Sequence, residues 1–202
     1  QQYVCQRITH TDMFALTALP PGVDKAEWLA SNTVAFFKHI NLFSSALSEF
    51  CTPSTCPTAC GPGNTVYVWT DDHGRKLKCS APLYFDYAMS YIQDLLTDED
   101  VFPTKAGKNV LFPTGFFFLV QKVFLLLFRT LAHIYWSHYK EALALGLHAH
   151  LNTLFTHLTL FFSGVLGIIS TFILKTRLLC VLTVLLPPVV PSSAQWLSPV
   201  SC

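Results

Sequence analysis

The sequence predicts a mainly α-helical domain that is held together by a structural metal ion. Apolar residues recur at spacings of four and three from Phe36 to Phe50, which places them on one stripe of a helix. Two cysteines and two histidines, paired as Cys-x4-Cys and His-x4-His, have the residue types and spacing of paired zinc ligands. The four candidate ligands are Cys51, Cys56, His133 and His138. An ion bound by all four would join two distant segments of the chain.

Length and composition favour one domain with a hydrophobic core. The chain has 202 residues, in which 13 Lys and Arg stand against 12 Asp and Glu. This balance gives no general attraction to nucleic acid. The seven cysteines are scattered and odd in number, and the first twelve residues contain no apolar run of the kind that a signal peptide has. We therefore expect a reducing compartment in which thiols are free for metal.

The first long helix is expected to begin at Asp24 and to run to about Cys51. Asp24 followed by Glu27 has the pattern of a capping box, in which the aspartate accepts hydrogen bonds from exposed amides at the helix start. The buried stripe of this helix is predicted to consist of Phe36, Ile40, Phe43, Leu47 and Phe50.

A short β-hairpin and a second helix should follow. The β-prone segments 65–69 and 75–79 enclose a turn-forming run in which Gly74 is available for positive φ. Pro82 suits the first turn of a helix that ends before the acidic break at 97–103. The buried side of that helix is predicted to include Leu83, Met89, Ile92 and Leu96.

Two further helices complete the expected order. A loop should lie between Pro103 and Pro113, followed by a third helix over 114–145. Gly146 is the expected end of that helix, and a fourth helix should begin at about residue 147.

The spacing of the histidines sets a geometric condition on the metal site. Positions five apart on an ideal helix point about 140° from each other. Binding through both His133 and His138 therefore needs a local adjustment of the helix or the use of different ring nitrogens. Cys60 and Cys79 are competing ligands, and the four candidates could also be ordinary helix histidines and small buried cysteines.

A zinc hydrolase is the less favoured alternative. Catalytic zinc needs an open coordination position and a nearby carboxylate. The sequence has no His-Glu-x-x-His motif, and Glu141, which we expect to be solvated, is the only obvious carboxylate near the histidines.

Several runs of sequence resemble the Mob kinase-activator (Mob/phocein) family. They are DKAEWLASNTVAFFKHINLFSSALSEFCTPSTC, KCSAPLYFDYAMS, LLTDEDVFPTK and LAHIYWSHYKEALALGLHAHLNT, in the family's order, and the resemblance covers about residues 7–160. It implies a four-helix bundle with structural Zn(II) bound by the four candidate ligands, no catalytic activity and no small-molecule substrate. It also implies a cytoplasmic and nuclear regulator that binds the N-terminal segment of an NDR/LATS-type AGC kinase.

The resemblance assigns a partner-binding face to the start of the first long helix. Asp24, Glu27 and Trp28 occupy the region where the family contacts basic residues of the kinase. Val23 and Ala35 stand where activating members carry acids, which implies weaker or more selective binding. The alternative is a purely structural role, which is helix capping for Asp24 and Glu27 and core packing for Trp28.

A second family surface, which docks phosphorylated peptides, is reduced here to Arg129. Leu125 and Leu126 replace the other basic residues, and a phosphate clamp needs several converging donors, so we expect poor phosphopeptide docking. Leu125 and Leu126, together with Phe117 and Phe118, make the third predicted helix apolar on all sides. This pattern predicts that the helix is buried on every side.

The sequence divides into a domain over 11–160, an N-terminal remnant over 1–10 and a divergent hydrophobic tail over 161–202. The uncharged run from 158 to 174 is at the lower limit for crossing a bilayer. Membrane attachment through the tail is therefore an alternative, although the two basic residues that follow would lie on the unfavoured side. A tail that was never selected to pack, encoded by an alternative exon or a misjoined gene, is the favoured interpretation. A folded helix that replaces the family's terminal segment is a further alternative.

Overall fold

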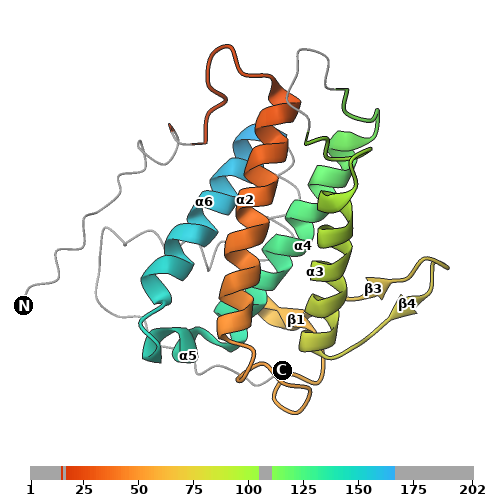
Figure 1. The fold of residues 1–202 in the computed structure, drawn as a ribbon. Helices are drawn as coiled ribbons and strands as arrows, with labels where there is room; N and C mark the ends of the chain where they lie inside the picture. Colours follow the sequence, from red (N-terminus) through yellow and green to blue (C-terminus); the bar gives the residue numbers. More distant parts are fainter. Residues whose placement is uncertain (1–14, 16, 105–110, 167–202) are drawn as a thin grey trace, which may run out of the picture.

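The computed structural model describes residue 15, residues 17–104 and residues 111–166, and most of this part is helical. The helices are α2 (Lys25–Ala46), α3 (Ala81–Thr97), α4 (Phe116–Ser137), α5 (Tyr139–Ala144) and α6 (His148–Leu166). Figure 1 shows the four long helices side by side, with the short α5 at the lower end of α6. Helix α4 packs against α2, α3 and α6 and is the centre of the core. The prediction of a mainly α-helical fold is confirmed.

Helix α2 begins as predicted but ends early. The Oδ1 atom of Asp24 accepts hydrogen bonds from the backbone N–H groups of Ala26 at 2.8 Å and Glu27 at 3.1 Å. The helix ends at Ala46, after which the chain turns toward the metal site. Phe50, predicted to be in the core, is therefore 37 % exposed. The other stripe residues, Phe36, Ile40, Phe43 and Leu47, are buried as predicted.

Helix α4 is apolar because it is surrounded by other helices. Among the described residues it is the one helix long and apolar enough to cross a membrane by length and composition, and 61 % of that stretch is buried inside the protein. The expected burial on every side is wrong at the first turn, where Phe118 is 75 % exposed and Phe117 is partly exposed. Of the three consecutive phenylalanines, only Phe116 is buried.

The strands form two short antiparallel pairs. Strand β1 (Cys60–Gly61) pairs with β2 (Thr65–Val66) across the 3₁₀ turn η1 (Pro62–Asn64), and β3 (Trp69–Thr70) pairs with β4 (Lys76–Leu77). Gly74 has φ 75° in the turn between β3 and β4, as predicted. The predicted strand over 65–69 is wrong in extent, because its first two residues pair with β1 and only Trp69 belongs to the hairpin.

Helix α3 has the predicted limits but a different buried face. Pro82 lies in its first turn, and the helix ends at Thr97, where the acidic break begins. Leu83, predicted to be buried, is 41 % exposed. The residues that α3 buries are Ala81, Tyr84, Phe85, Ala88 and Ile92, whereas Met89 and Leu96 are half-buried. The two aromatic residues of the first turns, rather than the leucine beside them, set the phase of the buried face.

The predicted third helix is divided into α4 and α5 by a break at His138, whose φ and ψ are −128° and 20°. Gly146, with φ 70°, follows α5 as expected. Helix α6 extends to Leu166, and it buries Phe161 and Phe162, so the core includes side chains beyond residue 160. Residues 158–162 of the candidate membrane run, 158–174, are thus part of the helical core. The N-terminal remnant, part of the predicted loop and the tail from residue 167 lie outside the described residues.

Candidate metal centre

The two cysteines lie on the loop that leaves α2. The backbone N–H of Cys51 donates to Leu47 O at 3.1 Å, and that of Cys56 donates to Thr52 O at 2.8 Å. The hydroxyl of Thr55 donates to Phe50 O at 2.7 Å. These short-range bonds fold the loop back on itself, so that both sulfur atoms point to the same side.

The two histidines come from α4 and from its end. His133 is fully buried within α4, while His138 terminates that helix and precedes α5. Its backbone N–H still donates to Ile134 O at 2.8 Å. The break at His138 is the local adjustment that the five-residue spacing requires, and it allows both rings to reach one point through the same ring nitrogen, Nε2.

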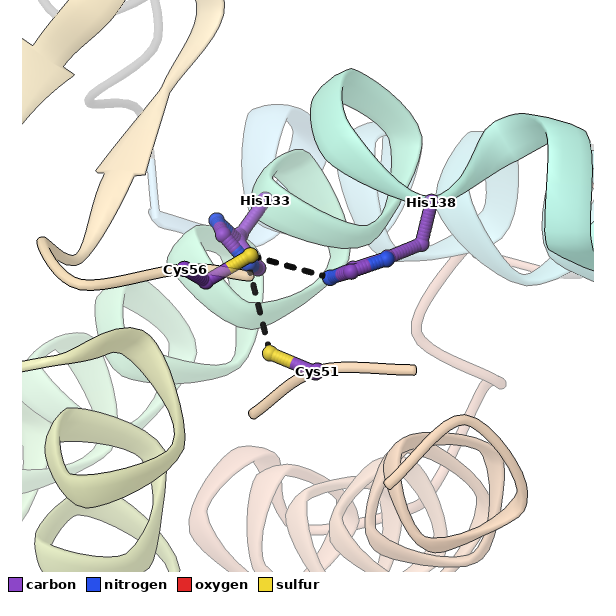
Figure 2. A group of neighbouring side chains, drawn as sticks. All are labelled: Cys51, Cys56, His133 and His138. Carbon is purple, nitrogen blue, oxygen red and sulfur yellow. Dashed lines mark hydrogen bonds between the residues drawn. The ribbon is translucent and has the colours of Figure 1, made fainter. Parts of the chain in front are cut away.

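The four side chains converge on one point (Figure 2). Cys51 Sγ lies 3.5 Å from His133 Nε2, and Cys56 Sγ lies 3.4 Å from His138 Nε2. All four ligand atoms lie within 4.8 Å of one another. A tetrahedral ion with bonds of about 2.3 Å to sulfur and about 2.05 Å to nitrogen would separate such atoms by about 3.6 Å. The spacing therefore fits a single metal ion, and the predicted grouping of these residues is confirmed.

A hydrogen bond from the opposite nitrogen fixes the ring of His133. Its Nδ1 donates to the carbonyl oxygen of Cys60 at 2.7 Å, and the ring lies against Phe85 with centroids 5.0 Å apart. The proton on Nδ1 leaves the Nε2 lone pair directed at the metal position.

Burial sets the protonation of the ligands before metal binds. Removal from water, followed by the neighbouring Cys56, raises the pKa of Cys51 to about 12. Burial lowers the pKa of His133 to about 4, and it also lowers the pKa of His138. At neutral pH both imidazoles are therefore neutral and ready to bind metal, whereas the Cys51 thiol must lose a proton to do so.

The competing cysteines take no part in the cluster. Cys60 is in a disulfide and offers only its carbonyl oxygen to the site, so the expectation of free thiols is wrong for this residue. Cys79 is a free, half-buried thiol outside the cluster. Glu141 also departs from expectation, because its side chain is half-buried and its Oε2 atom is buried rather than solvated.

The predicted partner-binding residues lie at the other end of α2. Asp24 and Glu27 are both exposed, and Asp24 also caps the helix. Trp28 is half-buried and stacks on Phe161 of α6, with ring centroids 4.7 Å apart. This contact gives Trp28 a packing role in the core, which is the alternative to contact with a partner.

Arg129, the remnant of the phosphopeptide surface, is occupied within the protein. Its Nη1 atom donates to the hydroxyl of Tyr84 at 2.7 Å, and its guanidinium lies 5.3 Å from the centre of the Tyr67 ring. Sequence reasoning missed both tyrosines. Tyr84 could have been found from the helical spacing of Tyr84, Ala88 and Ile92, but no local pattern indicates the position of Tyr67.

Comparison with known proteins places the chain in a family. The model of the Mob1/phocein family matches residues 5–164. The chain belongs to this family. Family members act as regulators and adaptors rather than catalysts, which confirms the prediction of a non-enzyme.

Three relatives show the extent of the similarity. MOB kinase activator 2 of Mus musculus is 53 % identical over 160 residues, which are 79 % of this chain and 67 % of the mouse protein. MOB kinase activator 2 of Homo sapiens is 56 % identical over 155 residues, 77 % of this chain and 64 % of the human protein. MOB kinase activator-like 2 of Drosophila melanogaster is 45 % identical over 154 residues, 76 % of this chain and 27 % of the fly protein. The chain thus spans about two thirds of the mammalian relatives and about a quarter of the fly relative.

Proposed function

We propose that this chain is a non-catalytic adaptor, a Mob-type four-helix bundle stabilised by Zn(II), that binds the N-terminal regulatory segment of an NDR/LATS-type kinase and modulates its activity. The observation that carries the proposal is the convergence of Cys51, Cys56, His133 and His138 in a member of the Mob1/phocein family. The relatives are named as kinase activators, which supports a kinase as the partner.

Zinc is the ion that suits this set of ligands. Two thiolates and two imidazoles are a common tetrahedral set for structural zinc, and the two thiolates neutralise its charge. Because the cysteines follow α2 and the histidines belong to α4 and its end, the ion would hold the two helices together at one end of the core. A structural site of this kind contributes roughly 10 kcal/mol or more to folding, so chelation should unfold the domain.

The proposed kinase-binding face is the exposed first turn of α2. Asp24 and Glu27 lie beside the helix N-terminus and are accessible to basic residues of a partner. Complementary charges steer association and set partner choice. Trp28 would support this face from beneath, through its contact with Phe161.

Charge-altering variants test the kinase proposal. Asp24→Asn removes a charge but keeps a good helix cap, and Glu27→Lys reverses a charge. In a titration with a basic kinase N-terminal peptide, the double variant should bind at least tenfold more weakly and retain its zinc. Glu49→Lys, an exposed change just beyond the far end of α2, is the matched control and should bind like the wild type. Equal binding by all variants, or no binding by the zinc-loaded wild type, would reject the proposal.

Poor phosphopeptide docking follows from the contacts of Arg129. Its guanidinium already engages Tyr84 and Tyr67, so a phosphate would have to displace those contacts.

For location in the cell we propose the cytoplasm and nucleus rather than a membrane. Support comes from α6, which uses Leu158, Phe161 and Phe162 in the core and so shortens the apolar run available to a bilayer.

A further inference from the structure

Glu141 lies three residues after His138, a candidate metal ligand, in the first turn of α5. His138 is the N-cap residue of α5, and Glu141 is the third residue of that helix. A glutamate at this position commonly reaches back to the N-cap residue, where it accepts a hydrogen bond from the backbone N–H. Here that N–H already donates to Ile134 O at 2.8 Å. The backbone N–H of His138 therefore does not need the Glu141 carboxylate, which can accept a hydrogen bond from another donor.

One oxygen atom of the Glu141 carboxylate is buried and needs a hydrogen-bond donor. Its Oε2 atom is buried and makes no hydrogen bond in the part of the chain that the structure describes. A buried polar atom of this kind is costly unless a donor reaches it.

The ring of His138 has a donor that needs an acceptor. Its Nε2 faces Cys56 Sγ at 3.4 Å, so Nδ1 carries the proton when Nε2 binds metal. For His133 the equivalent nitrogen donates to Cys60 O at 2.7 Å. The hydrogen bonds found within residues 17–104 and 111–166 include none from Nδ1 of His138. Metal-binding histidines almost always donate from the second nitrogen to a carboxylate, a carbonyl or water.

We propose that Glu141 is the positioning residue of the metal centre: its carboxylate accepts the Nδ1–H of His138 and holds that ring with Nε2 directed at the ion. The two histidines are then oriented by different acceptors, the backbone carbonyl of Cys60 for His133 and a side-chain carboxylate for His138. This inference rests on the proposed zinc site.

Two variants of the full chain separate hydrogen bonding from packing. Glu141→Gln retains an oxygen acceptor of the same shape, whereas Glu141→Leu fills the same space without an acceptor. Zinc affinity is measured by competition with a chromogenic chelator at pH 7.5, and circular dichroism checks the fold. The leucine variant should bind zinc 10- to 100-fold more weakly, which is the usual loss for such a partner, and the glutamine variant should stay within about threefold of the wild type.

Glu49→Ala is the control for charge alone. Glu49 is exposed and lies two residues before Cys51, so this change removes a carboxylate near the site without removing the partner of a ligand, and affinity should not change. The absorption spectrum of the Co(II)-loaded proteins supplies a second readout. The spectrum of Glu141→Leu should shift, while those of Glu141→Gln and Glu49→Ala should match the wild type. Should the leucine variant not fold, Glu141→Ala takes its place in both measurements.

The outcomes distinguish the inference from the proposals on which it depends. Wild-type affinity and spectrum in Glu141→Leu would overturn the positioning role while leaving the zinc site intact. An equal loss in the leucine and glutamine variants, or in Glu49→Ala, would overturn it as well, because charge rather than hydrogen bonding would then be responsible. A wild-type protein that binds no zinc would remove the zinc proposal and this inference together.

Discussion

Truncation of Phe161 tests whether the end of α6 belongs to the core. Its side chain is fully buried, and its ring centroid lies 4.7 Å from that of Trp28, 5.3 Å from that of Phe36 and 5.2 Å from that of Phe124. Phe161→Ala removes these contacts and leaves a cavity among α2, α4 and α6. We expect the variant to be less stable than the wild type.

The size of the effect follows from burial. A fully buried phenylalanine that is truncated to alanine costs about 3–5 kcal/mol, and the ring contacts at this position favour the upper half of that range. Since a domain is stable by only about 5–15 kcal/mol, roughly 4 kcal/mol is a large share. For a domain of this size it corresponds to a fall in Tm of roughly 8–16 °C.

Urea unfolding of the zinc-loaded protein, followed by circular dichroism, measures the change. Phe118→Ala is the matched control: it makes the same substitution at a side chain that is 75 % exposed, and it should change stability by less than about 0.5 kcal/mol. Equal midpoints for the two variants would refute the reasoning, because α6 would then not pack beyond residue 160.

Two further predictions concern protonation and backbone packing. Because burial holds the pKa of Cys51 at about 12, zinc binding at neutral pH displaces its proton, and zinc affinity should fall at least tenfold per unit as pH is lowered from 8 to 6.5. His133, with its pKa of about 4, adds nothing in that range; a flat profile in a chelator competition assay would contradict this. A Cβ at Gly61 would overlap the Tyr67 hydroxyl oxygen, so Gly61→Ala should lower the unfolding free energy by about 1–3 kcal/mol. Gly115→Ala, which has nothing within 4 Å, is the control in the same thermal melts, and an equal shift would count against the packing argument.

Predictions from local chemistry agree well with the structure. Asp24 is an N-cap because a short acceptor before a helix satisfies free amides wherever the rest of the chain lies. Gly74 and Gly146 adopt the positive φ expected where a turn or a helix end needs it. The four candidate metal ligands were found because paired cysteines and paired histidines at this spacing are typical of zinc sites.

Predictions that required long-range information were less accurate. Phe50 and Leu83 fit helical stripes, but the end of α2 and the phase of α3 are set by what each helix packs against, so both side chains are exposed. The strand predicted over 65–69 is divided because Thr65 and Val66 find a partner in β1. Periodicity describes one helix or strand at a time and contains no information about its neighbours.

The sequence by itself determined the helical class, the helix starts and the identity of the four candidate metal ligands, because capping, turn formation and ligand chemistry depend on a few adjacent residues. Only the tertiary structure decided how His133 and His138 meet, through the break that ends α4 at His138. It also decided that Arg129 is held by Tyr84 and that the Oε2 atom of Glu141 is buried. These features arise from contacts between segments far apart in the chain or from the backbone bending that those contacts impose.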